Sequence, residues 1–200
     1  MDIQKTIASL KRNGYQVSYF ETAAEAVNYL RDTVQGTTVG FGGSQTLTDL
    51  HLLDVLSEHN TVMAPDFPKP GENFYTTAVK AASADCYLLS ANALSENGEM
   101  VNIDASGNRL AGSIWGHRKV YFIVGTNKIV EDLDKAIWRA RNIAAPMNCR
   151  RFHLRTPCAV GEMKCYDCAS PQRLCHGILL YLRKMSAEAE VVLINEELGF

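Results

Sequence analysis

Four cysteines lie close together near the C-terminal end of the sequence. Cys158, Cys165, Cys168 and Cys175 follow the spacing C-x6-C-x2-C-x6-C. Two thiolates separated by two residues can point at one centre. Two more on flanking turns can complete a tetrahedral zinc shell or the corners of an iron–sulfur cluster. Glycine, serine and proline interrupt the run, so we expect turns to carry these four candidate metal ligands.

Two other interpretations of the four cysteines stay open. A Cys-x-x-Cys pair also serves thiol–disulfide exchange, and a cysteine can be a small core residue. The second interpretation suits Cys86, which begins an apolar run, better than Cys165 and Cys168, which lie in polar sequence. The spacing matches none of the standard zinc-finger or ferredoxin patterns. We expect the four thiols to share one centre, and a bound metal to order residues 156–176; without metal we expect disulfides or disorder there.

The composition is that of a globular domain. The chain has 200 residues, 46% of them hydrophobic, and a net charge of −2. This length suffices for one domain with its own core, so residues 1–200 are predicted to form a single domain. The charge gives no reason to expect nucleic acid or an anionic membrane as a partner. No signal peptide or bilayer-length apolar run is visible, which favours the cytoplasm. A monomer and a homo-oligomer are both open as assemblies.

Strand-like and helical patterns alternate along the chain and predict an α/β fold with a mainly parallel sheet flanked by helices. Apolar runs predict strands at residues 16–20, 37–41, 61–64, 86–90, 99–103, 119–124, 178–182 and 191–195. A turn and further extended chain are expected over 104–110. Apolar residues at helical spacing predict helices near the N-terminus, over 23–34, through 47–55, over 74–84 and over 129–144.

Polar loops follow three of the predicted strands. In open α/β sheets, ligands bind beyond the carboxyl ends of the strands. The first loop contains Gly42, Gly43, Ser44 and Thr46, whose glycines allow close backbone approach and whose hydroxyls can donate to an anion. In the alternative, purely structural interpretation, the glycines only turn the chain and Ser44 caps a helix.

The other two loops bring amides, carboxylates and cations. The loop after residue 90 carries Asn92, Asn108 and Arg109, and the guanidinium could hold a carboxylate or phosphate through two hydrogen bonds. Glu99 and Asp104 are the candidate acid–base groups there. The loop after residue 124 adds Asn127 and Lys128. Three such loops together predict a site for a small anionic metabolite.

Several short motifs of these loops resemble the lactate-utilisation (LUD) domain family. They are Gly42-Gly43-Ser44-x-Thr46-Leu47, Asn92-Ala93-Leu94, Gly98-Glu99, Asn102-x-Asp104, Gly107-Asn108-Arg109, Val124-Gly125-x-Asn127-Lys128 and Glu197-Leu198-Gly199-Phe200. They occur in the expected order from Phe41 to the end of the chain, and together they are specific. The family's fold is similar to that of glucosamine-6-phosphate isomerase, ribose-5-phosphate isomerase and the CoA-transferases.

The resemblance implies a role in oxidising lactate or a similar small acid, beside iron–sulfur and flavin partner subunits. It implies no particular reaction, so an enzyme and an accessory subunit are both open. The chain lacks the ferredoxin-like segments of larger lactate-utilisation subunits, and its cysteine loops resemble those of short single-domain members. Two rival hypotheses are an iron–sulfur or zinc protein for electron transfer or structure, and a regulator that senses a metabolite without turnover.

Overall fold

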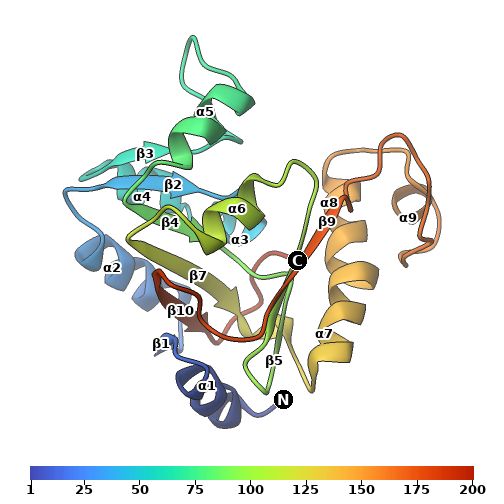
Figure 1. The fold of residues 1–200 in the computed structure, drawn as a ribbon, viewed down its shortest axis with the longest axis horizontal. Coiled ribbons are helices and arrows are strands. Elements are labelled where there is room, and N and C mark those ends of the chain that lie inside the picture. The colour runs from blue at the N-terminus through green and yellow to red at the C-terminus, as the bar shows by residue number, and fades with distance from the viewer.

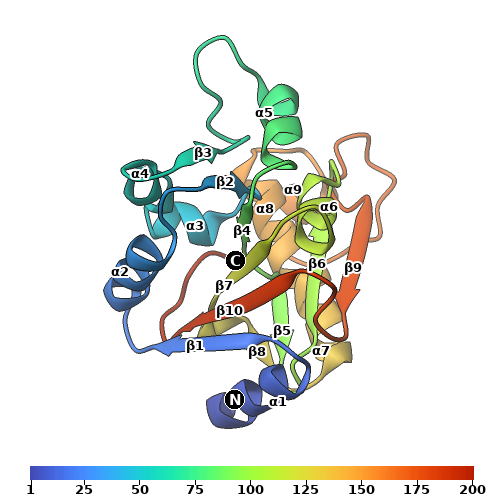
Figure 2. The same ribbon diagram turned by 60° about the vertical axis from the view of Figure 1, so that its left-hand side comes forward.

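A six-stranded parallel sheet forms the centre of the computed structural model, which describes residues 1–200. The strand order is β1-β10-β7-β4-β2-β3, and every neighbouring pair is parallel (Figures 1 and 2). The strands are β1 (Gln16–Phe20), β2 (Thr38–Phe41), β3 (Thr61–Met63), β4 (Cys86–Leu89), β7 (Lys119–Gly125) and β10 (Glu188–Ile194). This sheet confirms the predicted α/β fold class.

Helices cover one face of this sheet, and helices with a second sheet cover the other. On β4, Cys86 and Leu88 pack on one face while Tyr87 and Leu89 pack on the opposite one. Burial of both faces explains why the central strands are continuous apolar runs. The helices of the first face are α2 (Ala23–Thr33), α3 (Gln45–Asp49) and α4 (Leu52–Ser57). The other face carries α1 (Ile3–Arg12), α5 (Phe74–Ala81) and α6 (Asn108–Ile114).

The second sheet has four short strands in the order β8-β5-β6-β9. They are β5 (Ala93–Ser95), β6 (Met100–Asp104), β8 (Ile129–Val130) and β9 (Gly177–Tyr181). This sheet was not expected from the sequence. Two predictions are wrong here: residues 129 and 130 form a strand rather than the start of a helix, and residues 108–110 open helix α6 rather than continuing a turn or strand.

A continuous helical rod packs against the second sheet and extends past the predicted helix end at residue 144. It consists of α7 (Leu133–Arg139), the π-helical segment η2 (Ala140–Ala144) and α8 (Ala145–Arg151). Pro146 has no N–H and its ring would clash with the preceding turn of a regular α-helix. The wider η2 turn just before Pro146 lets the rod continue. The short α9 (Pro157–Val160) follows, and the 3-10 turn η1 (Thr126–Lys128) joins β7 to β8.

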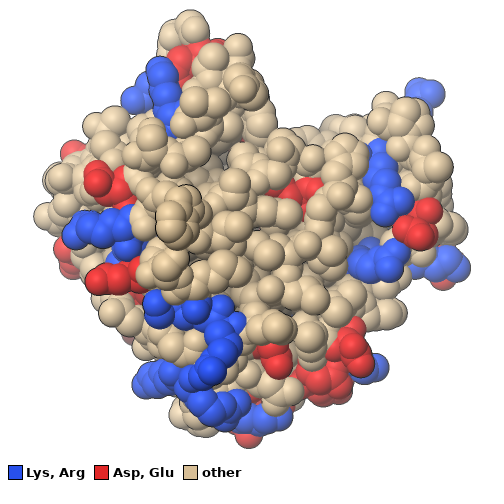
Figure 3. All heavy atoms as spheres, viewed as in Figure 1, with Lys and Arg blue, Asp and Glu red and all other residues tan.

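The space-filling view shows the molecule hollowed between the part around α5 and the part around α8 and α9 (Figure 3). Lysines and arginines also gather on the side of the molecule that carries α1. None of the helices combines the length and the apolar character that crossing a bilayer requires.

A buried carboxylate ties the edge of the main sheet together. Glu190 on β10 accepts hydrogen bonds from the hydroxyls of Ser18 and Tyr29 and from the Lys119 ammonium, each at 2.7 Å. Burial alone would raise the pKa of Glu190, but the hydrogen bonds from Lys119, Tyr29 and Ser18 outweigh it and hold the pKa below its ordinary value. The charge of Glu190 therefore contributes stability above the pKa of an unfolded glutamate, and this contribution is lost as the pH falls through the folded-state pKa.

Replacing Glu190 with glutamine should lower the free energy of unfolding at pH 7 by about 2–3 kcal/mol, because the Lys119 ammonium loses its partner. The deficit should shrink as the pH falls below about 4.3, the pKa of a glutamate in an unfolded chain, because the unfolded wild type then gains a proton before the folded protein does. Urea unfolding at several pH values measures both effects. Glu188→Gln, at an exposed position of the same strand, is the matched control. Equal deficits at pH 7 and pH 3 would contradict the role of the charge.

Candidate functional site

A cavity of about 210 Å³ lies at the carboxyl ends of β2, β4 and β7. These three strands are neighbours in the sheet, so the loops that follow them emerge at the same edge. We call this space the strand-end cavity. Its polar lining comes from Gly43, Ser44, Gln45, Thr46, Asp66, Ser90, Asn92, Asp104, Ser106, Asn108, Arg109, Lys128, Asn148 and Arg151.

The ammonium group of Lys128 lies at the buried end of the strand-end cavity. The residue is only 2% exposed, and its Nζ donates to the hydroxyls of Thr46 at 2.6 Å and Ser90 at 2.9 Å. No carboxylate forms an ion pair with it. Burial, helped by the charges of Arg139 and Arg109 and opposed by Asp49, lowers the pKa of Lys128 to about 7.

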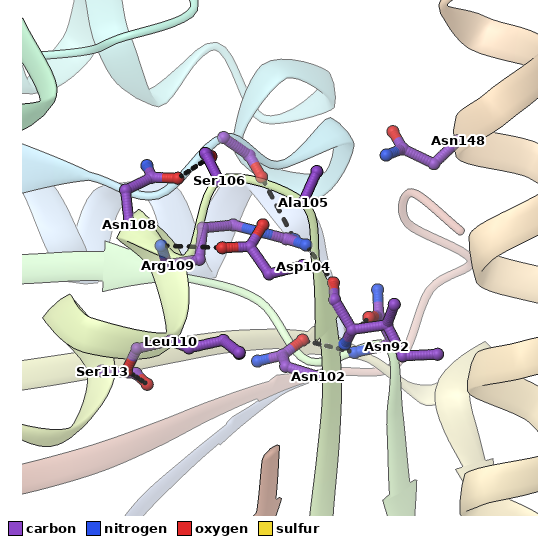
Figure 4. Close-up of polar contacts among 12 residues, drawn as sticks. Asn92, Asn102, Asp104, Ala105, Ser106, Asn108, Arg109, Leu110, Ser113 and Asn148 are labelled. Atoms are coloured by element: carbon purple, nitrogen blue, oxygen red, sulfur yellow. Dashed lines mark hydrogen bonds and ion pairs between the residues drawn. The ribbon is translucent and has the colours of Figure 1, made fainter. Parts of the chain in front are cut away.

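Arg109 fastens two of the loops to each other. Its Nε donates to Asp104 Oδ1 at 3.1 Å, Nη1 donates to the Gly43 carbonyl at 3.3 Å, and Nη2 donates to the Ile103 carbonyl (Figure 4). The backbone N–H of Arg109 also donates to Asp104. The predicted anion-gripping guanidinium is therefore engaged within the protein, and Asp104 is its counter-ion.

A second arginine and a pair of asparagines fix the loop after β4. Arg139 is buried and donates to the carbonyls of Asn92 at 2.6 Å and Asn127 at 3.1 Å. Burial lowers the pKa of Arg139 to about 10. Oδ1 of Asn92 accepts a hydrogen bond from the backbone N–H of Ile103. Oδ1 of Asn102 in turn accepts one from the backbone N–H of Asn92. These side chains hold the cavity wall in place (Figure 4).

Helix α8 supplies the opposite wall of the strand-end cavity. Asn148 faces the loop that carries Asp104 and Ser106 across the cavity (Figure 4). The Nε and Nη2 of Arg151 donate to Asn148 Oδ1 at 3.1 and 3.0 Å. Burial lowers the pKa of Arg151, Asp66 opposes this effect, and Arg109 adds to it. Asn148, Arg151 and Asp66 were not predicted as lining residues, because no local sequence motif marks them.

The structure brings most of the predicted ligand-binding residues together. Gly43, Ser44, Thr46, Asn92, Asp104, Asn108, Arg109 and Lys128 all line the strand-end cavity. Gly42 and Asn127 lie behind the lining. A Cβ on Gly42 would come within 2.9 Å of Arg109 Cγ, and Asn127 Oδ1 accepts a hydrogen bond from the Leu198 N–H at 3.3 Å. Ser44 precedes α3 but its side chain makes no capping hydrogen bond.

Glu99 is the predicted acid–base residue that lies apart from the cavity. It sits at the turn between β5 and β6, where its carboxylate accepts a hydrogen bond from the Ser95 hydroxyl. The same turn packs against α1, since Asn13 Nδ2 donates to the Asn97 carbonyl at 3.1 Å. Glu99 therefore has a local partner in the hairpin and no contact with the strand-end cavity.

The four clustered cysteines line a second cavity of about 520 Å³, which we call the thiol cavity. Cys149, from α8, forms part of the same wall. All six cysteines of the chain are free thiols, and no three histidine, cysteine or acidic side chains are close enough to hold one metal ion. Burial, helped by the neighbouring thiols of Cys149, Cys165 and Cys158 and opposed by Arg173, raises the pKa of Cys175 to about 11.

The lowered pKa of Lys128 predicts a pH-dependent contribution to stability. Between about pH 7 and pH 10 the unfolded chain holds the lysine proton more tightly, so the free energy of unfolding should rise with pH by up to about 1.4 kcal/mol per pH unit. Lys128→Met should lack this rise, as measured by urea unfolding across that range. Lys135→Met, at an exposed position, should keep it. Parallel curves for wild type and Lys128→Met would show that the pKa is not lowered.

Comparison with known proteins identifies the family. A family model described as the LUD domain matches residues 3–194. The crystal structure of a DUF162 family protein from Deinococcus radiodurans has a similar fold, with a TM-score of 0.56 over 96% of this chain and 95% of that chain at 10% sequence identity. No curated protein matches the sequence. Because the family match spans nearly all of its residues, this chain belongs to the LUD domain family.

Proposed function

We propose that this LUD domain protein binds a small anionic metabolite, a carboxylate of the lactate class, in the strand-end cavity. The observation that carries the proposal is the buried ammonium of Lys128, which has hydroxyl partners but no carboxylate partner. Burying an unpaired charge is costly, and a bound anion would remove most of that cost. The membership of the LUD domain family supports a small organic acid as the anion.

The remaining charges of the cavity also favour an anion. Among the side chains of the lining, Asp104 neutralises Arg109 through their ion pair, which leaves Lys128 and Arg151 as cations and Asp66 as the remaining side-chain carboxylate. The Ser44 hydroxyl is available as a further donor. The volume of about 210 Å³ is below the range of about 300–1,000 Å³ typical of drug-sized ligands, so the cavity suits a metabolite of a few heavy atoms.

Lys128 is also the group best suited to move a proton in this cavity. An acid–base group works best when its pKa lies near the operating pH, and burial brings the pKa of Lys128 to about 7. Asp104 is held by Arg109 and serves to orient that side chain. We therefore assign proton transfer, if the bound acid is turned over, to Lys128. A sensing protein would bind the same anion without turnover, and a product assay separates the two.

Binding of L-lactate, pyruvate and inorganic phosphate can be measured by isothermal titration calorimetry. Lys128→Met should weaken binding of the preferred anion by about ten- to a hundred-fold, which corresponds to the loss of one charge-assisted hydrogen bond. Lys135→Met should bind like the wild type. Thermal unfolding of each variant checks that the fold is retained.

Affinity should fall as the pH rises above about 7, because Lys128 then loses its proton and its attraction for the anion. The Lys128→Met variant should show no such pH dependence. Absence of binding by all three anions at millimolar concentration, or equal affinities for wild type and Lys128→Met, would overturn the proposal.

A further inference from the structure

The thiol cavity is a second candidate binding site, separate from the strand-end cavity. Cys158 lies on α9, Cys165 and Cys168 lie on the loop that follows, and Cys175 lies just before β9, yet all four line one space of about 520 Å³. Each of the four side chains is partly exposed, whereas Cys86 and Cys149 are buried. The segment that carries them folds back over α8, as Figure 1 shows.

The segment over residues 157–176, before strand β9, has little hydrophobic core of its own; only Cys175 packs against one of the core clusters. No residue in it is buried, and its larger apolar side chains point outward: Val160 is 71% exposed, Tyr166 44% and Met163 42%. Ordering a segment of this length costs about 1–2 kcal/mol of backbone entropy per residue. Hydrogen bonds from arginines support it locally, for example from Arg173 to the carbonyls of Cys168 at 2.7 Å and Cys175 at 3.0 Å. Bonds from the four thiolates to a shared group would supply the missing interactions.

We propose that Cys158, Cys165, Cys168 and Cys175 ligate an iron–sulfur cluster in the thiol cavity, and that this cluster orders residues 157–176, up to the start of β9. Cys149 of helix α8 lies beside Cys158 but is buried, at 1% exposure, so the four more exposed thiols are assigned as the ligands.

The four-cysteine lining of the thiol cavity is the usual ligand set of an iron–sulfur cluster. Zinc holds sulfur at about 2.3 Å, so four zinc ligands must approach one another to about 3.8 Å. No three candidate ligands in this structure reach such an arrangement, although the four cysteines surround one cavity. In a cluster, several iron ions joined by sulfide share the four thiolates, so the thiolates can stand farther apart.

The polar groups around the cavity suit an anionic cluster. Arg141 Nη2 lies 3.5 Å from Cys165 Sγ, and the Asp167 N–H donates to the same sulfur at 3.4 Å. Hydrogen bonds to sulfur and nearby positive charge stabilise a thiolate-ligated cluster and set its reduction potential. Arg173 brings a second guanidinium to the cavity, and Asp167 pairs with both arginines at 3.2 Å.

The test is to prepare the full chain under anaerobic conditions and, separately, to reconstitute it with ferrous iron and sulfide. The expected result is iron and acid-labile sulfide in equal amounts, a broad visible absorption, and an electron paramagnetic resonance signal in either the isolated or the dithionite-reduced protein. Zinc in place of iron, disulfides among the four cysteines, or a protein that takes up neither iron nor sulfide would overturn the proposal.

Variants locate the site. Cys165→Ala combined with Cys168→Ala should lose the iron, the sulfide and the visible absorption, whereas Cys86→Ala, a buried cysteine of the main sheet, should keep all three. Far-UV circular dichroism checks that each variant is folded. Retention of the cluster by the double variant would contradict the ligand assignment.

A measurement on the wild-type chain tests the ordering directly. Lys164 lies in the exposed loop between two of the proposed ligands. Trypsin cleavage after Lys164 should be at least about ten-fold slower in the cluster-loaded protein than in the cluster-free protein. Cleavage after Lys11, in helix α1, should be the same in both preparations. Equal cleavage rates after Lys164 would overturn the claim that the cluster orders the segment.

Discussion

Burying the ammonium of Lys128 costs free energy, and the loops at the strand ends are arranged to limit that cost. Thr46 begins the helix after β2, Ser90 follows β4, and Lys128 follows β7, so the two hydroxyl groups that accept from Nζ come from two different loops. The three loops meet at one point because their strands are neighbours in the parallel sheet. Burial, with the nearby charges of Arg139 and Arg109, lowers the pKa of Lys128, and two neutral acceptors do not offset this as a counter-ion would.

Two other cations of this region are used to build the cavity. Arg109 holds the loop after β2 to the end of β6 through the carbonyls of Gly43 and Ile103, and Arg139 holds the loops after β4 and β7 through the carbonyls of Asn92 and Asn127. Backbone carbonyls buried at loop ends need donors, and a guanidinium supplies several in a fixed geometry. These contacts give the cations different roles. The two arginines set the shape of the cavity, and Lys128 supplies the charge that a ligand would meet.

The sequence predicted the loops of the site better than the helix that faces them. Glycines, hydroxyls and Lys128 directly after apolar strands were enough to place one wall, because parallel strands deliver their loops to a common edge. The second sheet was missed because strands as short as Ile129–Val130 pair with distant partners and leave no local period. Arg151 was missed for a related reason: the apolar helical pattern ended at residue 144, whereas the π-helical turn lets the helix continue past Pro146 to Arg151.

Helix α8 connects the two cavities physically. Asn148 and Arg151 line the strand-end cavity, while Pro146 and Cys149 line the thiol cavity, because successive positions on a helix face different directions. Cys175 lines both spaces, together with Ile103, Ala145 and Leu174. The two cavities therefore share one helix and four lining residues, and the same short stretch of α8 contributes to the wall of each.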